Sequence, residues 1–240
     1  MKKLVLGALL VAAASAGCGG SGGGDTSAVI TAHWPFTHVD GTASGQCDPS
    51  FGTAAIYSQP WDPVSNRLLD APVIDKFNCS AMRGTTDPLD GIFLVWVQIE
   101  SDDGSRIFVK SKETYIDTLD GDLVIDFPIL DDGGYFFLTW DLVDATSNAP
   151  LTCAKAGIGK NGSVETVATI AGGTDGAVDK FTCEHGFGTT DALEQGTYTV
   201  VVDANDNSGL AIGTAPELTN KVIHAPGGLT DLGHILIPIN

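Results

Sequence analysis

The sequence predicts an all-β protein made of two tandem β-sandwiches, and two observations support that prediction. The stretch 75–79 returns as 179–183, and nine of the fifteen positions in 75–89 are identical to those in 179–193 at a constant offset of 104. Short apolar runs rich in β-branched and aromatic residues, such as 92–97, end in turns that contain Gly, Asn and Asp. A repeat of this length indicates two consecutive domains and not a solenoid.

The 240 residues fit two domains, because a typical domain has about 100–150 residues. We predict a first repeat at 28–130 and a second at 135–240, each a sandwich of about seven short strands. Beyond the first eighteen residues, no window of twelve keeps a helical apolar period. The clearest expected strands are 29–37, 53–58, 92–97, 107–110, 123–129, 135–142, 164–170, 197–202, 221–224 and 233–239.

The N-terminus is expected to be a targeting segment. Lys2 and Lys3 precede an apolar stretch at 4–14 that is too short to span a bilayer. Ser15-Ala16-Gly17-Cys18 resembles a bacterial lipoprotein signal, in which the cysteine is acylated and becomes the first residue. The usual leucine three places before the cysteine is replaced by Ser15, and a plain secretory signal cut near Ala16 is the alternative.

This resemblance implies where the chain is located. Residues 1–17 would be removed, fatty acyl chains such as palmitate would anchor Cys18, and the Gly-rich tether at 18–27 would separate the repeats from the membrane. No aspartate follows Cys18, so the resemblance implies the bacterial outer membrane. A secreted or periplasmic protein is the alternative location.

The net charge argues against nucleic acids and anionic lipid headgroups as partners. The formal charge is −18, and loss of Lys2 and Lys3 with the signal makes the mature chain two units more negative. Nucleic acids require a basic surface, and anionic lipid headgroups also repel such a chain. The membrane is therefore expected to be contacted through the N-terminal lipid only.

Four cysteines remain besides Cys18, an even number typical of disulfides in an oxidising compartment. Of the three ways to pair them, the duplication selects Cys47–Cys79 and Cys153–Cys183. Their spacings of 32, 74 and 30 contain no Cys-x-x-Cys motif, which argues against a zinc site and against redox catalysis.

One segment carries a resemblance to a known family. Residues 193–200, Leu-Glu-Gln-Gly-Thr-Tyr-Thr-Val, resemble the Leu-x-x-Gly-x-Tyr-x-Val signature of carboxypeptidase regulatory-like domains, which the B-type repeats of bacterial collagen adhesins share. These domains are transthyretin-like sandwiches, related in architecture to immunoglobulin-like ones. The resemblance implies a surface lipoprotein in which Tyr198 packs between two sheets. The first copy departs from the signature, because 89–93 is one residue shorter and has Phe93 in place of the tyrosine.

Calcium is the one cofactor considered from the sequence. Residues 203–209 carry oxygen ligands at alternate positions, as calcium loops do. Ser208 occupies the EF-hand glycine position and Thr214 the position of the bidentate glutamate, so a plain hairpin turn is the alternative. His33 and His38 lie five positions apart on an expected strand and therefore on opposite faces, so no metal-ligating residues are predicted.

No catalytic residues are predicted. The chain has no Gly-x-Ser-x-Gly or His-Glu-x-x-His motif and no phosphate-binding glycine loop. Asp87 and Asp191 are interpreted as turn-capping groups.

We therefore predict a non-enzymatic, lipid-anchored envelope protein that binds a protein or glycan partner through its sandwich loops. A purely structural spacer and an enzyme with unrecognised carboxylate chemistry are the alternatives. An exposed aromatic platform that includes Trp61 would favour glycan binding, whereas a packed Trp61 would favour the spacer.

Substitution of Cys18 by alanine tests the anchoring prediction. Cys18→Ala should move the protein from the membrane fraction to the soluble fraction, because the acyl chains supply the membrane affinity. Cell fractionation measures this, and mass spectrometry of the wild-type N-terminus identifies the lipid. Retention of the variant on membranes, or an unlipidated wild-type chain that begins near Gly17, would contradict the prediction.

Overall fold

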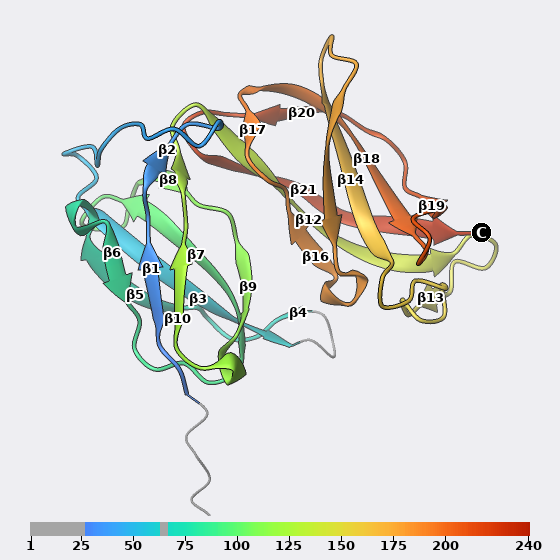
Figure 1. Ribbon diagram of the computed structural model, residues 1–240, viewed down its shortest axis with the longest axis horizontal. Helices are drawn as coiled ribbons and strands as arrows, with labels where there is room; N and C mark the ends of the chain where they lie inside the picture. Colours follow the sequence, from blue (N-terminus) through green and yellow to red (C-terminus); the bar gives the residue numbers. More distant parts are fainter. Residues whose placement is uncertain (1–26, 63–66) are drawn as a thin grey trace, which may run out of the picture.

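The computed structural model describes residues 27–62 and 67–240, and these are almost entirely β-strands and turns (Figure 1). The predicted all-β class is confirmed. The signal peptide expected at 1–17, Cys18 and the tether up to residue 26 lie outside the described residues. Within the described ranges, no helix has the length and apolar character needed to cross a bilayer.

The described residues of the first half, up to residue 130, form three sheets of six, three and two strands around one hydrophobic core. Its elements are β1 (Ile30–His33), β2 (Phe36–Thr37), β3 (Thr53–Asp62), β4 (Arg67–Leu68), β5 (Val73–Asn78), the 3-10 helix η1 (Cys79–Ala81), β6 (Arg83–Thr85), β7 (Ile92–Glu100), β8 (Ile107–Lys110), β9 (Thr114–Asp117), η2 (Thr118–Asp120), β10 (Leu123–Asp126) and β11 (Ile129–Leu130). In the six-stranded sheet β3 pairs with β7, in the three-stranded sheet β1 lies between β6 and β10, and the two-stranded sheet consists of β2 and β11.

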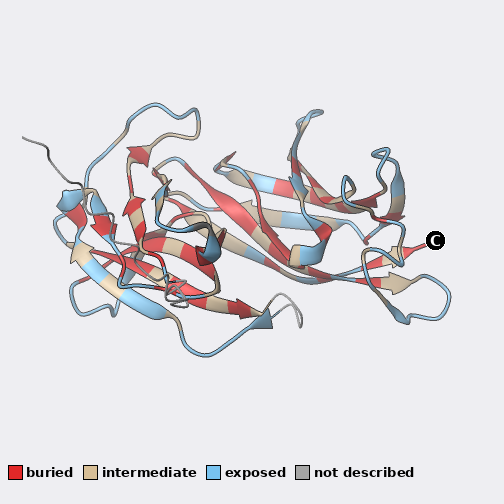
Figure 2. Cartoon of the chain, turned by 60° about the horizontal axis from the view of Figure 1, so that its bottom comes forward, coloured by how far each residue is buried: buried red, intermediate tan, exposed pale blue. Residues whose placement is uncertain are grey.

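The second half, residues 133–240, has a core of its own. Its elements are β12 (Gly133–Asp144), β13 (Pro150–Leu151), β14 (Ser163–Ile170), β15 (Gly176–Phe181), η3 (Cys183–His185), β16 (Phe187–Thr189), β17 (Leu193–Glu194), β18 (Gly196–Asn205), β19 (Ala211–Thr214), β20 (Leu218–Ile223) and β21 (Gly228–Ile239). Figure 2 shows buried residues along the strands of both halves, while the turns between strands are largely exposed.

The two halves share their main strand connections. β3 of the first half pairs with β5 and β7, and its counterpart β14 pairs with β15 and β18. Likewise β7 pairs with β8 and β9, and its counterpart β18 pairs with β19 and β20. In both halves the first strands pair in parallel with the last ones. β1 pairs with β10 and β2 with β11 in the first half, and β12 pairs with β21 in the second. Every ladder between described strands joins strands of the same half.

The halves differ at one corner. β19 pairs with β21 at Gly213 and Ile239, which joins the two layers of the second half into one curled sheet. A Cβ atom on Gly213 would lie 2.4 Å from the carbonyl oxygen of Pro238, so the contact requires glycine. The equivalent residue of β8, 104 positions earlier, is Val109. Among the described strands, β8 makes no corresponding pair.

Two predicted strands are interrupted, and several others were missed, among them β5, β9, β15 and β19. The expected strand 29–37 is split at Pro35, and 123–129 is split at Pro128, because proline has no N–H for the ladder. The recurring stretches became the edge strands β5 and β15, which were not predicted. Their residues are mostly exposed or half-buried, so they lack the apolar pattern that identifies a strand.

A buried tryptophan contacts a disulfide in each half. The indole N–H of Trp34 donates to the carbonyl oxygen of Cys79 at 2.8 Å, and that of Trp140 donates to Cys183 at 3.2 Å. Cys79 is bonded to Cys47, and Cys183 to Cys153, which are the pairs that the duplication predicts.

The recurring Phe and Gly residues pack against each other. A Cβ atom on Gly84 would lie 2.4 Å from the ring of Phe77, and one on Gly188 would lie 2.6 Å from the ring of Phe181. Any side chain at these glycines would displace the ring. The recurrence of both residues therefore reflects one steric constraint, present in both halves.

At Tyr198, the signature segment of the second half has the geometry that its resemblance implies. Tyr198 is buried, packs edge-on against Phe136 at 5.6 Å between ring centroids, and donates its hydroxyl to the carbonyl oxygen of Glu194 at 2.8 Å. Phe93 occupies the corresponding strand of the first half and is also buried.

Removal of one disulfide should destabilise mainly its own half. Cys47→Ala with Cys79→Ala opens a loop with a sequence separation of 32 residues. The free energy of unfolding of the first half should fall by about 3 kcal/mol. Hydrogen exchange read by mass spectrometry separates the halves, and Cys153→Ala with Cys183→Ala is the matched control. Equal loss of protection in both halves from either variant would contradict two independent cores.

Candidate functional site

The two halves meet where β11 passes into β12 (Figure 1). Asp131 and Asp132 are the residues between these strands, and each is held by a different half. The backbone N–H of Asp131 donates to the carbonyl oxygen of Thr37 at 3.2 Å. The carbonyl oxygen of Asp132 accepts from the N–H of Gln195, also at 3.2 Å. The connecting segment is therefore fixed by backbone hydrogen bonds on both sides.

An aromatic cluster joins the halves beside this segment. Phe187 of β16 lies 4.7 Å from Trp61 of β3 in edge-on geometry, and Tyr115 of β9 stacks on His185 at 4.3 Å, both between ring centroids. Burial lowers the pKa of His185 and raises the pKa of Tyr115, so both rings favour their neutral forms near pH 7. Trp61 is 5% exposed and therefore does not offer the exposed platform considered from the sequence.

The sequence interpretation missed His185 and Phe187, although a signal for them exists. They stand where the first copy has Ala81 and Arg83, both of which are exposed. These positions interrupt the recurring motif, and in the second copy they carry aromatic rings. A difference between the copies, and not their identity, marks the surface that the second half presents to the first.

A cleft of about 550 Å³ opens beside the cluster and has walls from both halves. An ion pair crosses it, because Lys112 Nζ lies 2.8 Å from Asp191 Oδ1. The side chains that bring charge or aromatic surface to this junction cleft include Lys112, Tyr115, Lys180, His185, Phe187 and Asp191. A second cleft of about 480 Å³ shares Lys112 and Asp191 and is more apolar, with Phe127, Leu130 and Tyr135 in its wall.

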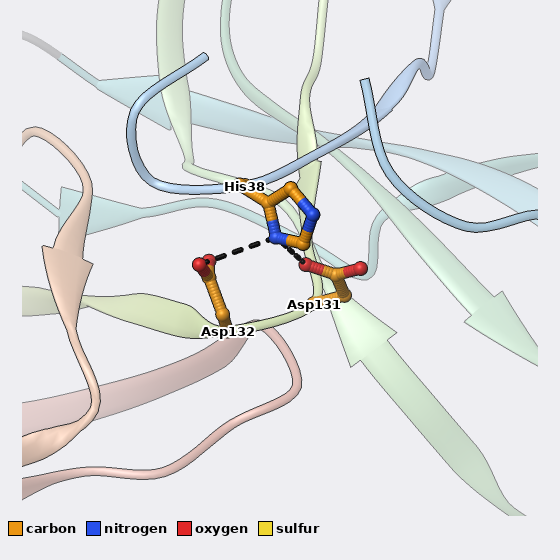
Figure 3. A group of neighbouring side chains, drawn as sticks. All are labelled: His38, Asp131 and Asp132. Carbon is orange, nitrogen blue, oxygen red and sulfur yellow. Dashed lines mark ion pairs between the residues drawn. The ribbon is translucent and has the colours of Figure 1, made fainter. Parts of the chain in front are cut away.

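His38 lies between the two carboxylates of the connecting segment (Figure 3). Its Nδ1 atom is 2.8 Å from Asp131 Oδ1 and 3.2 Å from Asp132 Oδ2. His33 instead pairs with Asp126 at 3.1 Å. Among the described residues, only the group of His38, Asp131 and Asp132 has three possible metal ligands within 4.8 Å of one another. It was missed because the carboxylates follow the histidine by more than ninety residues.

The loop considered for calcium is a hairpin turn between β18 and β19. The Asp206 carboxylate accepts hydrogen bonds from the hydroxyl and N–H of Ser208 and from the N–H of Leu210, and these lower its pKa. Asp203 accepts from the Thr214 hydroxyl at 2.6 Å. One carboxylate oxygen of Asp206 and one of Asp203 are thus engaged in hydrogen bonds of the hairpin, which favours the plain turn over a calcium loop.

Asp75 and Asp179 are the capping residues of the recurring motif. Asp75 accepts the backbone N–H of Asp87 at 3.3 Å, and Asp179 accepts that of Asp191 at 2.7 Å. The interpretation of Asp87 and Asp191 as the capping side chains was therefore wrong, because they contribute the N–H. Burial raises the pKa of both Asp75 and Asp179. Such a shift in a cleft often marks a catalytic acid, but Asp75 has the same arrangement away from the cleft, which favours a structural role.

Substitutions at Asp179 separate its hydrogen bond from its charge. Asp179→Asn keeps an acceptor for Asp191 and removes a buried charge, so at neutral pH the free energy of unfolding should equal or exceed that of the wild type. Asp179→Ala leaves the N–H of Asp191 without its acceptor and should lower the free energy of unfolding by roughly 1 kcal/mol.

The pH dependence of these variants follows from the raised pKa of Asp179. The folded state keeps this proton to higher pH than the unfolded chain, so wild-type stability falls as pH rises from the ordinary value of 3.8 through the raised value. The advantage of Asp179→Asn should therefore appear at neutral pH and shrink in acid. Urea denaturation at neutral and at acidic pH measures the free energy of unfolding of each variant. A more stable Asp179→Ala than Asp179→Asn at neutral pH would contradict the prediction.

Protein-family models and curated proteins give no match to this sequence. Among solved structures, the minor pilin of Streptococcus agalactiae aligns with 15% identity over 89% of this chain and 97% of its own, with a TM-score of 0.29. A candidate adhesin from Bacteroides ovatus aligns with 10% identity over 80% and 76%, TM-score 0.30. A candidate polysaccharide-binding protein from Bacteroides thetaiotaomicron aligns with 9% identity over 82% and 98%, TM-score 0.28. Scores this low identify neither a family nor a ligand for this chain.

Proposed function

We propose that this chain is a non-enzymatic protein of the cell envelope that binds a glycan in the junction cleft. The observation that supports the proposal is the cleft itself, which has aromatic and charged side chains from both halves beside the cluster of Trp61, Tyr115, His185 and Phe187. Binding sites often lie at such boundaries between packed units.

The size and chemistry of the cleft favour a glycan over a protein partner. Its volume of about 550 Å³ falls in the range of about 300–1,000 Å³ typical of small-ligand sites. A stable protein interface instead buries about 800 Å² of solvent-accessible surface on each partner. Tyr115 lines the cleft and would contact the C–H groups of a sugar, and Lys112 and Asp191 would exchange their ion pair for hydrogen bonds to its hydroxyls.

The remaining parts of the proposal concern anchoring and organisation. An acylated Cys18 followed by a Gly-rich tether would hold the protein at the outer membrane. We take 28–130 and 135–240 as its two domains, since each half has its own core, disulfide and sheet connections.

A spacer without a ligand is the second candidate function, and the burial of Trp61 favours it. Trp61 and Phe187 fill the boundary between the halves, as a rigid spacer would require. The two functions differ in whether the junction cleft has a ligand. A catalytic role for Asp179 has less support, because its arrangement is repeated at Asp75.

Glycan binding is tested with the purified chain and a panel of envelope and host polysaccharide fragments, measured by calorimetry. Tyr115→Ala and Lys112→Ala should each weaken binding at least roughly ten-fold, equivalent to about 1.4 kcal/mol. Lys155→Ala removes the same charge from an exposed position outside the junction cleft and is the matched control. Absence of binding to the whole panel, or unchanged binding by Tyr115→Ala, would overturn the proposal and leave the spacer function.

A further inference from the structure

We infer that His38, Asp131 and Asp132 form a binding site for a divalent first-row transition-metal ion such as Zn²⁺, located where the two halves join. The site contains one imidazole nitrogen and two carboxylate oxygens (Figure 3). It lies on the connecting segment and is independent of the glycan proposed for the junction cleft.

The separations between the donor atoms suit a shared ion. Zinc bonds of about 2.0–2.2 Å to nitrogen and oxygen place neighbouring ligand atoms roughly 3 Å apart. The observed separations from His38 Nδ1 are 2.8 Å to Asp131 Oδ1 and 3.2 Å to Asp132 Oδ2. One ion can therefore contact all three atoms after small side-chain rotations.

A carboxylate oxygen of this group is buried and makes no hydrogen bond within the described part of the chain, although it lies at ion-pair distance from the imidazole. Asp131 Oδ1 is shielded from solvent and accepts no hydrogen bond among the described residues, although His38 Nδ1 is only 2.8 Å away. At the His33–Asp126 pair, in contrast, Nδ1 does make a hydrogen bond, at 3.1 Å. A buried acceptor without a donor is unfavourable, and a bound cation would satisfy it.

The surrounding backbone holds the donors in place. The N–H of His38 donates to the carbonyl oxygen of Thr42 at 2.8 Å, which closes a turn. The second oxygen of the Asp132 carboxylate accepts the N–H of Val39, also at 2.8 Å. Gly133 admits no side chain, because a Cβ atom there would lie 2.3 Å from Val39 Cγ2. Outer contacts of this kind orient metal ligands.

Charge and exposure determine the class of ion. A neutral imidazole with two carboxylates balances a divalent cation, and a chain of net charge −18 attracts cations in general. Imidazole ligands favour zinc, copper, nickel or iron, whereas calcium and magnesium require oxygen ligands. The three side chains are 34–49% exposed, which leaves room for water as the remaining ligands.

The test is a calorimetric titration of Zn²⁺ into the full chain with Cys18→Ala as background, so that no free thiol competes for the metal. One ion per chain is expected. Loss of an outer-shell contact alone costs roughly 10–100-fold in metal affinity. His38→Ala and Asp131→Asn should therefore each weaken binding at least ten-fold. His33→Ala is the matched control and should bind as the background does.

Two further measurements make the result decisive. Asp131→Asn and Asp132→Asn preserve side-chain shape, and metal-free circular dichroism should match the background, so a loss of binding would not reflect misfolding. An equimolar amount of Ca²⁺ should not displace Zn²⁺. The inference is overturned if Zn²⁺ does not saturate one site, if His38→Ala binds as the background does, or if Ca²⁺ displaces Zn²⁺.

Discussion

The hydrogen bond from a buried indole to the carbonyl oxygen of a disulfide-bonded cysteine is the contact on which each half of this protein depends. Trp34 in the first half and Trp140 in the second have almost no exposed surface, so their N–H groups require a partner inside the protein. Cys79 and Cys183 provide it, and each cysteine opens the 3-10 helix that follows an edge strand. One contact thus fixes the first strand, the edge strand and the disulfide relative to one another.

The duplication produced a surface that neither copy would have alone. The exposed Ala81 and Arg83 of the first copy correspond to His185 and Phe187 of the second, which pack against residues of the first half. The turn after the edge strand therefore faces solvent in one copy and an aromatic cluster in the other. The junction cleft lies beside these packed aromatic rings, and the ion pair of Lys112 with Asp191 links its two walls.

The connecting segment has a second consequence for the junction. A linker of two residues places Asp131 and Asp132 within reach of the turn that follows β2, and Gly133 lets the backbone approach that turn closely. A longer linker would separate the carboxylates from His38. The short connection and the lack of space at Gly133 thereby bring acidic groups and an imidazole together.

The sequence by itself determined the β class, the two-fold repetition and the cysteine pairs. All three are encoded locally or by recurrence: turn residues follow apolar runs, Cys79, Phe77 and Gly84 recur 104 positions later, and Trp34 and Cys47 recur 106 positions later as Trp140 and Cys153. It did not reveal the edge strands β5 and β15, because their exposed residues carry no apolar period. It also assigned the capping role to Asp87 and Asp191 when Asp75 and Asp179 perform it, since sequence order does not show which side chain reaches which backbone group.

The candidate sites were decided by the tertiary structure alone. Trp61 is buried in a cluster that includes Phe187 of the other half, and the parallel pairing of β2 with β11 brings His38 close to Asp131 and Asp132. These contacts join residues more than ninety positions apart, between segments without a shared motif. Local patterns report what each strand buries, whereas the meeting of two distant surfaces depends on how the complete sheets pack.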